Sequence, residues 1–242
     1  VSEDEAKESQ KPSKPSGTTD RVLPAQLRFS VADFFITGAI KKILGQVDFH
    51  HSMLVHTSIN VVPHGYLKDK IRNLCTFWRR QYLADSWGER TEWYGWFKER
   101  WETEFSIPSS DESEMDSAMK SFLNDFNPQT MVRKINSVPP GSDELIETKN
   151  KLDYDDVPGG LKVIAIGGAI LSRGLTVEGL TISYFTRETA IGDSLTQMAR
   201  WCGFHKDWGN LIRVRTTETI REWFDWIHDV ESSLRSDIER YD

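Results

Sequence analysis

Residues 161 to 179 read Leu161-Lys-Val-Ile-Ala-Ile-Gly-Gly-Ala-Ile-Leu-Ser-Arg-Gly-Leu-Thr-Val-Glu-Gly179. The first six positions are almost continuously apolar, as is usual in the central strands of parallel sheets. The glycine pair that follows lets the backbone approach a ligand. Ligands of open α/β sheets lie beyond the carboxyl ends of the strands. The stretch therefore predicts a central parallel strand that leads into a ligand-binding loop.

The segments on either side of this stretch continue an α/β pattern. Short apolar runs predict further strands at 52–58, 130–135, 180–185 and 211–215. Apolar residues at steps of three and four predict helices from Pro24 to about Gly45, from Tyr66 to about Ala84 and from Asp193 to Cys202. Strands that alternate with helices indicate a parallel sheet covered by helices.

Three segments depart from this alternation. Residues 1–20 hold Ser, Lys, Glu, Pro and Gly without an aromatic side chain, which predicts a disordered linker or tail before a domain at 21–242. Residues 86–126 are rich in tryptophan and in helical spacing, and we expect a helical insertion there. The last helix carries one apolar stripe, which we assign to core packing rather than to a partner: Trp223, Ile227, Val230, Leu234, Ile238 and Tyr241.

The composition excludes several classes of protein. A chain of 242 residues that is 38% hydrophobic is long enough for one substantial core. No apolar run approaches the roughly 20 residues that span a bilayer, and two cysteines are too few for a disulfide framework. The chain starts without Met, and we expect a cytoplasmic protein of which this is a piece. With a net charge of −7, any contact to DNA must be local or shared with a missing partner domain.

Two groups of residues have the chemistry for a phosphorylated ligand. Ser172, Arg173 and Gly174 combine a small residue, a fixed cation and a glycine in the loop after a strand. Gln197 and Arg200 lie three apart, so one helix face can present an amide and a guanidinium together, and such an arginine can stabilise a transferring phosphoryl group. The alternatives are a surface turn for the first group and an ordinary solvated pair for the second.

Together the two groups resemble a known family. The order of a strand, Ser-Arg-Gly-Leu-Thr, a strand and a Gln-x-x-Arg helix is similar to motifs V and VI of superfamily-two helicases. More closely, Gly-Gly-x-x-Leu-Ser-Arg-Gly-Leu-Thr-x-Glu-Gly-Leu and Gln-Met-x-Arg-Trp-x-Gly resemble the Z-one (Z1) domain of DEAD/Z-one helicase-like proteins. The likeness extends from about residue 21 to the end and is strongest over 161–215.

The resemblance implies a RecA-like, three-layer second lobe of an ATP-driven DNA motor, often part of a restriction or phage-defence system. An upstream DEAD-type lobe would supply the phosphate-binding loop and the acid that binds Mg²⁺, and ATP would lie between the lobes. A nuclease or another defence subunit would be a further partner. The implied roles are an arginine finger for Arg200 with Gln197 positioning it; a nucleotide cleft at Gly168, Arg173, Gly174, Thr176 and His205; and DNA contacts at Thr57, Ser58 and Ser172.

One departure from the family pattern keeps other functions open. Where the family usually has Gly-Arg-Trp-Phe-Gly-Tyr-Arg, this chain has Ala199, Cys202, Phe204 and finally His205 in place of the second arginine. Histidine is only partly charged near neutral pH. A non-catalytic docking or coupling module is therefore the alternative. Alone the chain should not hydrolyse ATP, because it has no Gly-x-x-x-x-Gly-Lys-Ser/Thr sequence.

Other candidate residues favour ordinary structural roles, and we expect no metal site. His50, His51 and His56 include no pair at a helical metal spacing, and Asp153, Asp155 and Asp156 indicate a solvated turn. Asp143, Glu147 and Lys149 would suit a magnesium-dependent nuclease, but their spacing is cramped. The tryptophans from 87 to 101 lie in a mixed or acidic region, which favours packing over base stacking.

Overall fold

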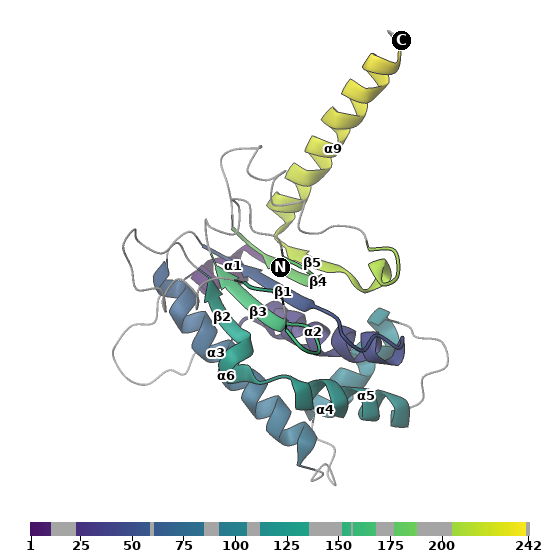
Figure 1. Ribbon diagram of the computed structural model, residues 1–242. Coiled ribbons are helices and arrows are strands. Elements are labelled where there is room, and N and C mark those ends of the chain that lie inside the picture. Colours follow the sequence, from purple (N-terminus) through teal and green to yellow (C-terminus); the bar gives the residue numbers. More distant parts are fainter. Residues whose placement is uncertain are drawn as a thin grey trace.

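Five parallel strands form a single sheet in the computed structural model (Figure 1). The structure describes residues 1–10, 23–58, 61–84, 92–105, 112–135, 152–155, 157–167, 177–187 and 205–240. The strands are β1 (His51–His56), β2 (Val132–Ile135), β3 (Lys162–Gly167), β4 (Leu180–Phe185) and β5 (Arg213–Thr216), in the order β2-β3-β1-β4-β5. This is the predicted α/β, RecA-like arrangement, with β1 at the centre.

The helices follow the predicted alternation. They are α1 (Glu3–Gln10), α2 (Ala25–Ile43), α3 (Val61–Leu83), α4 (Glu92–Arg100), α5 (Glu112–Asp125), α6 (Pro128–Met131) and α9 (Glu218–Glu239). A π-helical turn, Trp101–Phe105, extends α4, and a 3-10 turn, Gly209–Leu211, precedes β5. Helices α4 and α5 lie within the predicted helical insertion. The helix predicted at 193–202 lies outside the described residues.

The main core lies on one face of the sheet. Helices α2 and α3 pack there against alternate residues of the strands, and α4 and α5 pack on α2 and α3; the strand residues include Met53, Val55, Ile164, Ile166 and Ile182. Figure 1 shows these helices together on one side of the sheet. The opposite face buries a smaller cluster around Leu54, Val163, Ala165 and Leu180, covered in part by Leu152 and Tyr154.

Close backbone contacts set the spacing of the strands at their amino ends. Gly160 and Gly179 have φ angles of +73° and +65°, in the left-handed region that favours glycine. A Cβ atom at Gly160 would lie 2.3 Å from the Phe49 carbonyl oxygen, and one at Gly179 would lie 2.0 Å from the His50 carbonyl oxygen. The loops before β3 and β4 therefore pack directly on the chain before β1.

A buried ion cluster joins the insertion to the rest of the domain. The Arg100 guanidinium donates to both carboxylate oxygens of Asp33, at 2.7 and 2.9 Å, and Arg215 donates to one of them at 2.7 Å. Asp33 on α2 is fully buried. One carboxylate thus connects α2, α4 and β5.

The prediction of a linker at residues 1–20 is wrong for residues 3–10, which form α1. Ala6 and Ser9 are buried, and Gln10 Nε2 donates to the Thr186 carbonyl at 3.4 Å. Glu3 accepts a hydrogen bond from Thr219 at 3.1 Å. These polar contacts with residues far along the chain hold α1 against the domain, and composition alone does not predict them. Residues 11–20 lie outside the described part of the chain.

The apolar stripe of α9 does not pack into the core as we predicted. Only the beginning of the helix is covered by the described residues: the buried Ile220 packs on Phe185, and Phe224 and Ile227 are partly buried against them. Farther along, Trp226, Leu234 and Ile238 are 66%, 57% and 63% exposed. Figure 1 shows the reason: after β5 the helix projects away from the sheet. Helical spacing predicted the stripe but not the direction in which the helix leaves the domain.

Candidate functional site at the carboxyl edge of the sheet

The parallel strands bring several polar residues to one edge of the sheet. β1 and β4 are neighbours, and their register pairs Val55 with Tyr184 and His56 with Phe185. Thr57 and Thr186, each the first residue after its strand, therefore leave the sheet side by side. Both are buried. The predicted DNA contacts Thr57 and Ser58 thus lie at the carboxyl edge, where ligands of α/β sheets lie.

His56 and Arg187 form the central polar contact of this edge. Arg187 Nη1 donates to His56 Nε2 at 3.1 Å, and the Thr186 amide donates to the His56 carbonyl at 3.1 Å. The His56 ring lies 5.4 Å from the Phe185 ring, between centroids. Burial, together with the charges of Arg187 and His64, lowers the pKa of His56 to about 3. His56 is therefore neutral at physiological pH and accepts a hydrogen bond from the guanidinium without neutralising its charge.

Within the described ranges, the buried polar atoms at this edge without a hydrogen-bond partner include three that lie at the ends of adjacent strands. They are Thr57 Oγ1, Arg187 Nε and, at the end of β5, Thr216 Oγ1. Buried polar groups in proteins are nearly always hydrogen-bonded, so a group of exceptions needs an explanation. Since these atoms follow three adjacent strands, a polar ligand or partner at the edge would explain them together.

A histidine of α3 forms a hydrogen bond with the backbone of Ser58. The buried His64 donates from Nε2 to the Ser58 carbonyl at 2.9 Å. This contact holds the turn after β1 against the start of the next helix. The site thus rests on a rigid segment of backbone.

His205 lies at the opposite edge. Its ring stacks on Trp208, with 4.0 Å between centroids and 15° between planes. Trp208 precedes β5 and lies over the ammonium group of Lys41, whose Nζ is 3.5 Å from the ring centroid. Lys41 also donates to Thr181 Oγ1 at 3.0 Å, near the start of β4. The structure therefore separates His205 from Thr57 by about the length of a strand, or roughly 20 Å.

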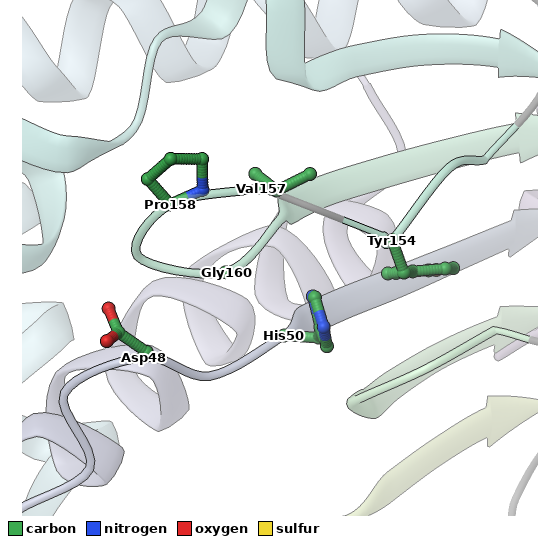
Figure 2. A pocket seen from close by; sticks show the side chains of 6 residues that line it. All are labelled: Asp48, His50, Tyr154, Val157, Pro158 and Gly160. Carbon is green, nitrogen blue, oxygen red and sulfur yellow. The ribbon is translucent and has the colours of Figure 1, made fainter.

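A second concave region lies at this amino edge. It is a pocket of about 410 Å³ lined by Asp48, His50, Tyr154, Val157, Pro158 and Gly160. Figure 2 shows His50 and Tyr154 next to each other, with Asp48 at the other end. His50 Nδ1 accepts from the Leu161 amide at 3.0 Å, and the Tyr154 hydroxyl lies 3.1 Å from Ser52 Oγ. These polar groups already have partners, unlike Thr57 Oγ1 and Arg187 Nε, for which the described residues supply none.

Most of the predicted catalytic and nucleotide-binding residues lie outside the described residues. These are Gly168, Ser172, Arg173, Gly174, Thr176, Gln197 and Arg200. Their described neighbours Gly167 and Arg187 lie at the carboxyl edge, at the ends of β3 and β4. The residues considered for a nuclease site, Asp143, Glu147 and Lys149, also lie outside the described residues. Within the described residues, no group of three His, Cys, Asp or Glu side chains could hold a metal ion.

Arg187 is the site residue that the sequence analysis missed. It follows strand 180–185 at the same offset at which Ser58 follows the first strand. Its position two residues after a predicted parallel strand was a usable signal. Its contact with His56, 131 positions earlier, has no local signature.

Comparison with known proteins agrees with the architecture. A family model described as the Z1 domain matches residues 26–242. No curated protein and no solved structure matches the chain. None of the helices in the described ranges has the length and apolar character needed to cross a membrane.

Proposed function

Because the chain belongs to the Z1 domain family, we propose that it is the second RecA-like lobe of an ATP-dependent, helicase-like motor that acts on DNA. The motor would operate in the cytoplasm, as part of a restriction or phage-defence system. The observation that supports this proposal best is the group of unpartnered donors at the carboxyl edge. Phosphates supply acceptors to such donors.

The architecture fits the role of one lobe in a two-lobe ATPase. In an open parallel sheet the carboxyl edge is the side on which ligands bind. A partner lobe that faced this edge would enclose ATP between the two bodies. The upstream DEAD-type lobe would supply the phosphate-binding loop and the Mg²⁺ ligands, since this sequence has no such loop.

Arg200 and Gln197 are the proposed catalytic residues of this lobe. A guanidinium that reaches the γ-phosphate stabilises the charge that develops during phosphoryl transfer. Gln197, one helical turn earlier, would hold that guanidinium in place. Arg173, Gly174, Thr176 and Gly168 would approach the nucleotide, while Ser172, Thr57 and Ser58 would contact the DNA backbone.

The test is Arg200→Ala in the longer protein that includes the upstream lobe. We expect ATP turnover to fall by about 10³-fold or more, with nucleotide affinity largely kept. The matched control is Arg235→Ala, which removes the same charge from the exposed part of α9. Turnover of Arg200→Ala equal to that of the control would refute the motor assignment.

A docking module without ATPase activity is the second candidate. Two observations favour it: His205 replaces an arginine of the family pattern, and its ring stacks on Trp208 at the amino edge. ATPase assays of the longer protein with and without DNA distinguish the two functions, since the docking function predicts no turnover in either condition. Magnesium-dependent DNA cleavage by this chain alone would instead favour the nuclease function.

A further inference from the structure

We propose that Arg187, oriented by His56 and assisted by the Thr57 hydroxyl, binds a phosphate group at the carboxyl ends of β1 and β4. The phosphate belongs either to the DNA backbone or to a nucleotide. This choice of ligands rests on the proposed function. The binding site itself follows from charge, hydrogen bonding and burial at this edge. Neither the family pattern nor the motifs assign a role to Arg187.

The first argument is the unbalanced charge of Arg187. This side chain is partly buried, and within the described ranges it forms no ion pair with a carboxylate. Burial lowers its pKa. A cation held away from water without a counter-ion destabilises the fold. An anionic ligand would remove that cost.

The second argument is the way in which His56 orients the guanidinium. His56 is fully buried, and its backbone carbonyl is fixed by the Thr186 amide. Because its ring accepts at Nε2, it uses one of the five N–H groups of Arg187 and leaves others for a ligand. A neutral imidazole holds the guanidinium in one direction but leaves its full positive charge available.

The third argument is a hydroxyl at the same edge of the sheet. Within the described ranges, Thr57 Oγ1 is buried without a hydrogen-bond partner, and Thr57 leaves β1 next to Thr186 on β4. A hydroxyl can donate one hydrogen bond, and a guanidinium fork can donate two. An ionised phosphate oxygen only accepts, so this set of donors matches phosphate.

Two carboxylates of the neighbouring helix α1 are engaged elsewhere. Helix α1 lies on this edge through Ser9, whose Oγ is 3.5 Å from Thr186 Oγ1. On α1, Glu3 accepts from Thr219 at 3.1 Å and Glu5 accepts from the Gln26 amide at 3.4 Å. These two carboxylates are directed to α9 and α2. They do not neutralise Arg187.

The experiment compares binding by the full chain of 242 residues and three variants. The probes are fluorescein-labelled oligo-dT for the DNA backbone and a fluorescent ATP analogue for the nucleotide. Arg187→Gln removes the cation, and Thr57→Val removes the hydroxyl at similar size. Arg235→Gln is the matched control, because it lowers the net charge equally but lies far along α9.

We expect Arg187→Gln to weaken binding of one probe by about tenfold or more, while Arg235→Gln stays within about twofold of the unchanged chain. Weaker DNA binding, with a slope of log affinity against log salt reduced by about 0.7, identifies a single-strand phosphate. Weaker binding of the ATP analogue alone identifies a nucleotide phosphate. Either result supports the site.

Thr57→Val separates binding from folding. Since the hydroxyl has no hydrogen-bond partner among the described residues, its removal should not lower the urea midpoint, yet it should weaken binding of the probe that Arg187→Gln affects. The proposal is overturned if Arg187→Gln binds both probes like the control, or if the unchanged chain binds neither. Because binding needs no hydrolysis, the result is independent of the Arg200→Ala turnover that tests the motor.

Discussion

The buried ammonium group of Lys41 should make the stability of the domain rise with pH near neutrality. Lys41 has no exposed surface, donates to Thr181 and lies under the Trp208 ring. Within the described part of the chain it forms no ion pair. Burial lowers its pKa from 10.5 to about 7. Between these two values the unfolded chain binds more protons than the folded one, so the free energy of unfolding increases with pH.

The size of the effect follows from the same two pKa values. One pKa unit corresponds to about 1.4 kcal/mol, and Lys41 is half-deprotonated in the folded state at about pH 7. From about pH 7 to about pH 8.5 it should therefore add roughly 1.5 kcal/mol to the free energy of unfolding. Lys162, whose pKa burial also lowers, contributes in the same direction. Burial raises the pKa of the Cys75 thiol, and that opposite effect is small because it sets in only at the upper end of this range.

The assay is urea unfolding followed by circular dichroism at both pH values. Lys41→Met should lose most of the increase, because a methionine of similar length keeps the packing but cannot titrate. Lys42→Met is the matched control: its ammonium lies beside Asp125, 2.5 Å away, and the variant keeps Lys41. The reasoning is refuted if Lys41→Met shows the same increase with pH as Lys42→Met.

Two further predictions test the architecture. Asp33→Asn should lower the free energy of unfolding by about 3–5 kcal/mol, because it leaves the cations of Arg100 and Arg215 without their shared carboxylate. A loss under about 1 kcal/mol in urea titrations would contradict the cluster. Leu234→Ala on the exposed stripe of α9 should lower the free energy of unfolding by under about 0.5 kcal/mol, whereas Leu27→Ala in the core should lower it by about 2–5 kcal/mol. Equal losses would mean that the stripe is buried.

The sequence predicted the strands well because burial on both faces leaves a clear mark. β1, β3 and β4 are short and buried at every position, which gives short runs with few charged side chains, largely apolar in β3. The order of strands along the chain then leads to a parallel sheet by ordinary connection rules. The position of the ligand edge follows from that sheet, and Thr57 and Ser58 lie there.

The remaining features depend on contacts between distant segments. Arg187 and His56 are 131 positions apart, and Arg215 and Asp33 are 182 apart. Neither pair changes the local pattern of apolar residues on which the predictions rested. The same limit explains α9, because helical spacing identifies an apolar face but not whether a surface exists to cover it.

The two edges of the sheet differ in a way that separates stability from function. At the amino edge, the buried polar side chains pair within the domain: Lys41 with Thr181, and the His51 ring with the Phe34 carbonyl at 2.8 Å. At the carboxyl edge, Thr57 Oγ1 and Arg187 Nε are buried without a hydrogen-bond partner in the described part of the chain. A group that is already paired contributes to folding, so its loss should appear as lower stability. An unpaired donor contributes little to folding, so selection for folding alone would not keep it. Binding is therefore the better explanation for the carboxyl edge, and substitutions there should alter ligand affinity at little cost to the fold.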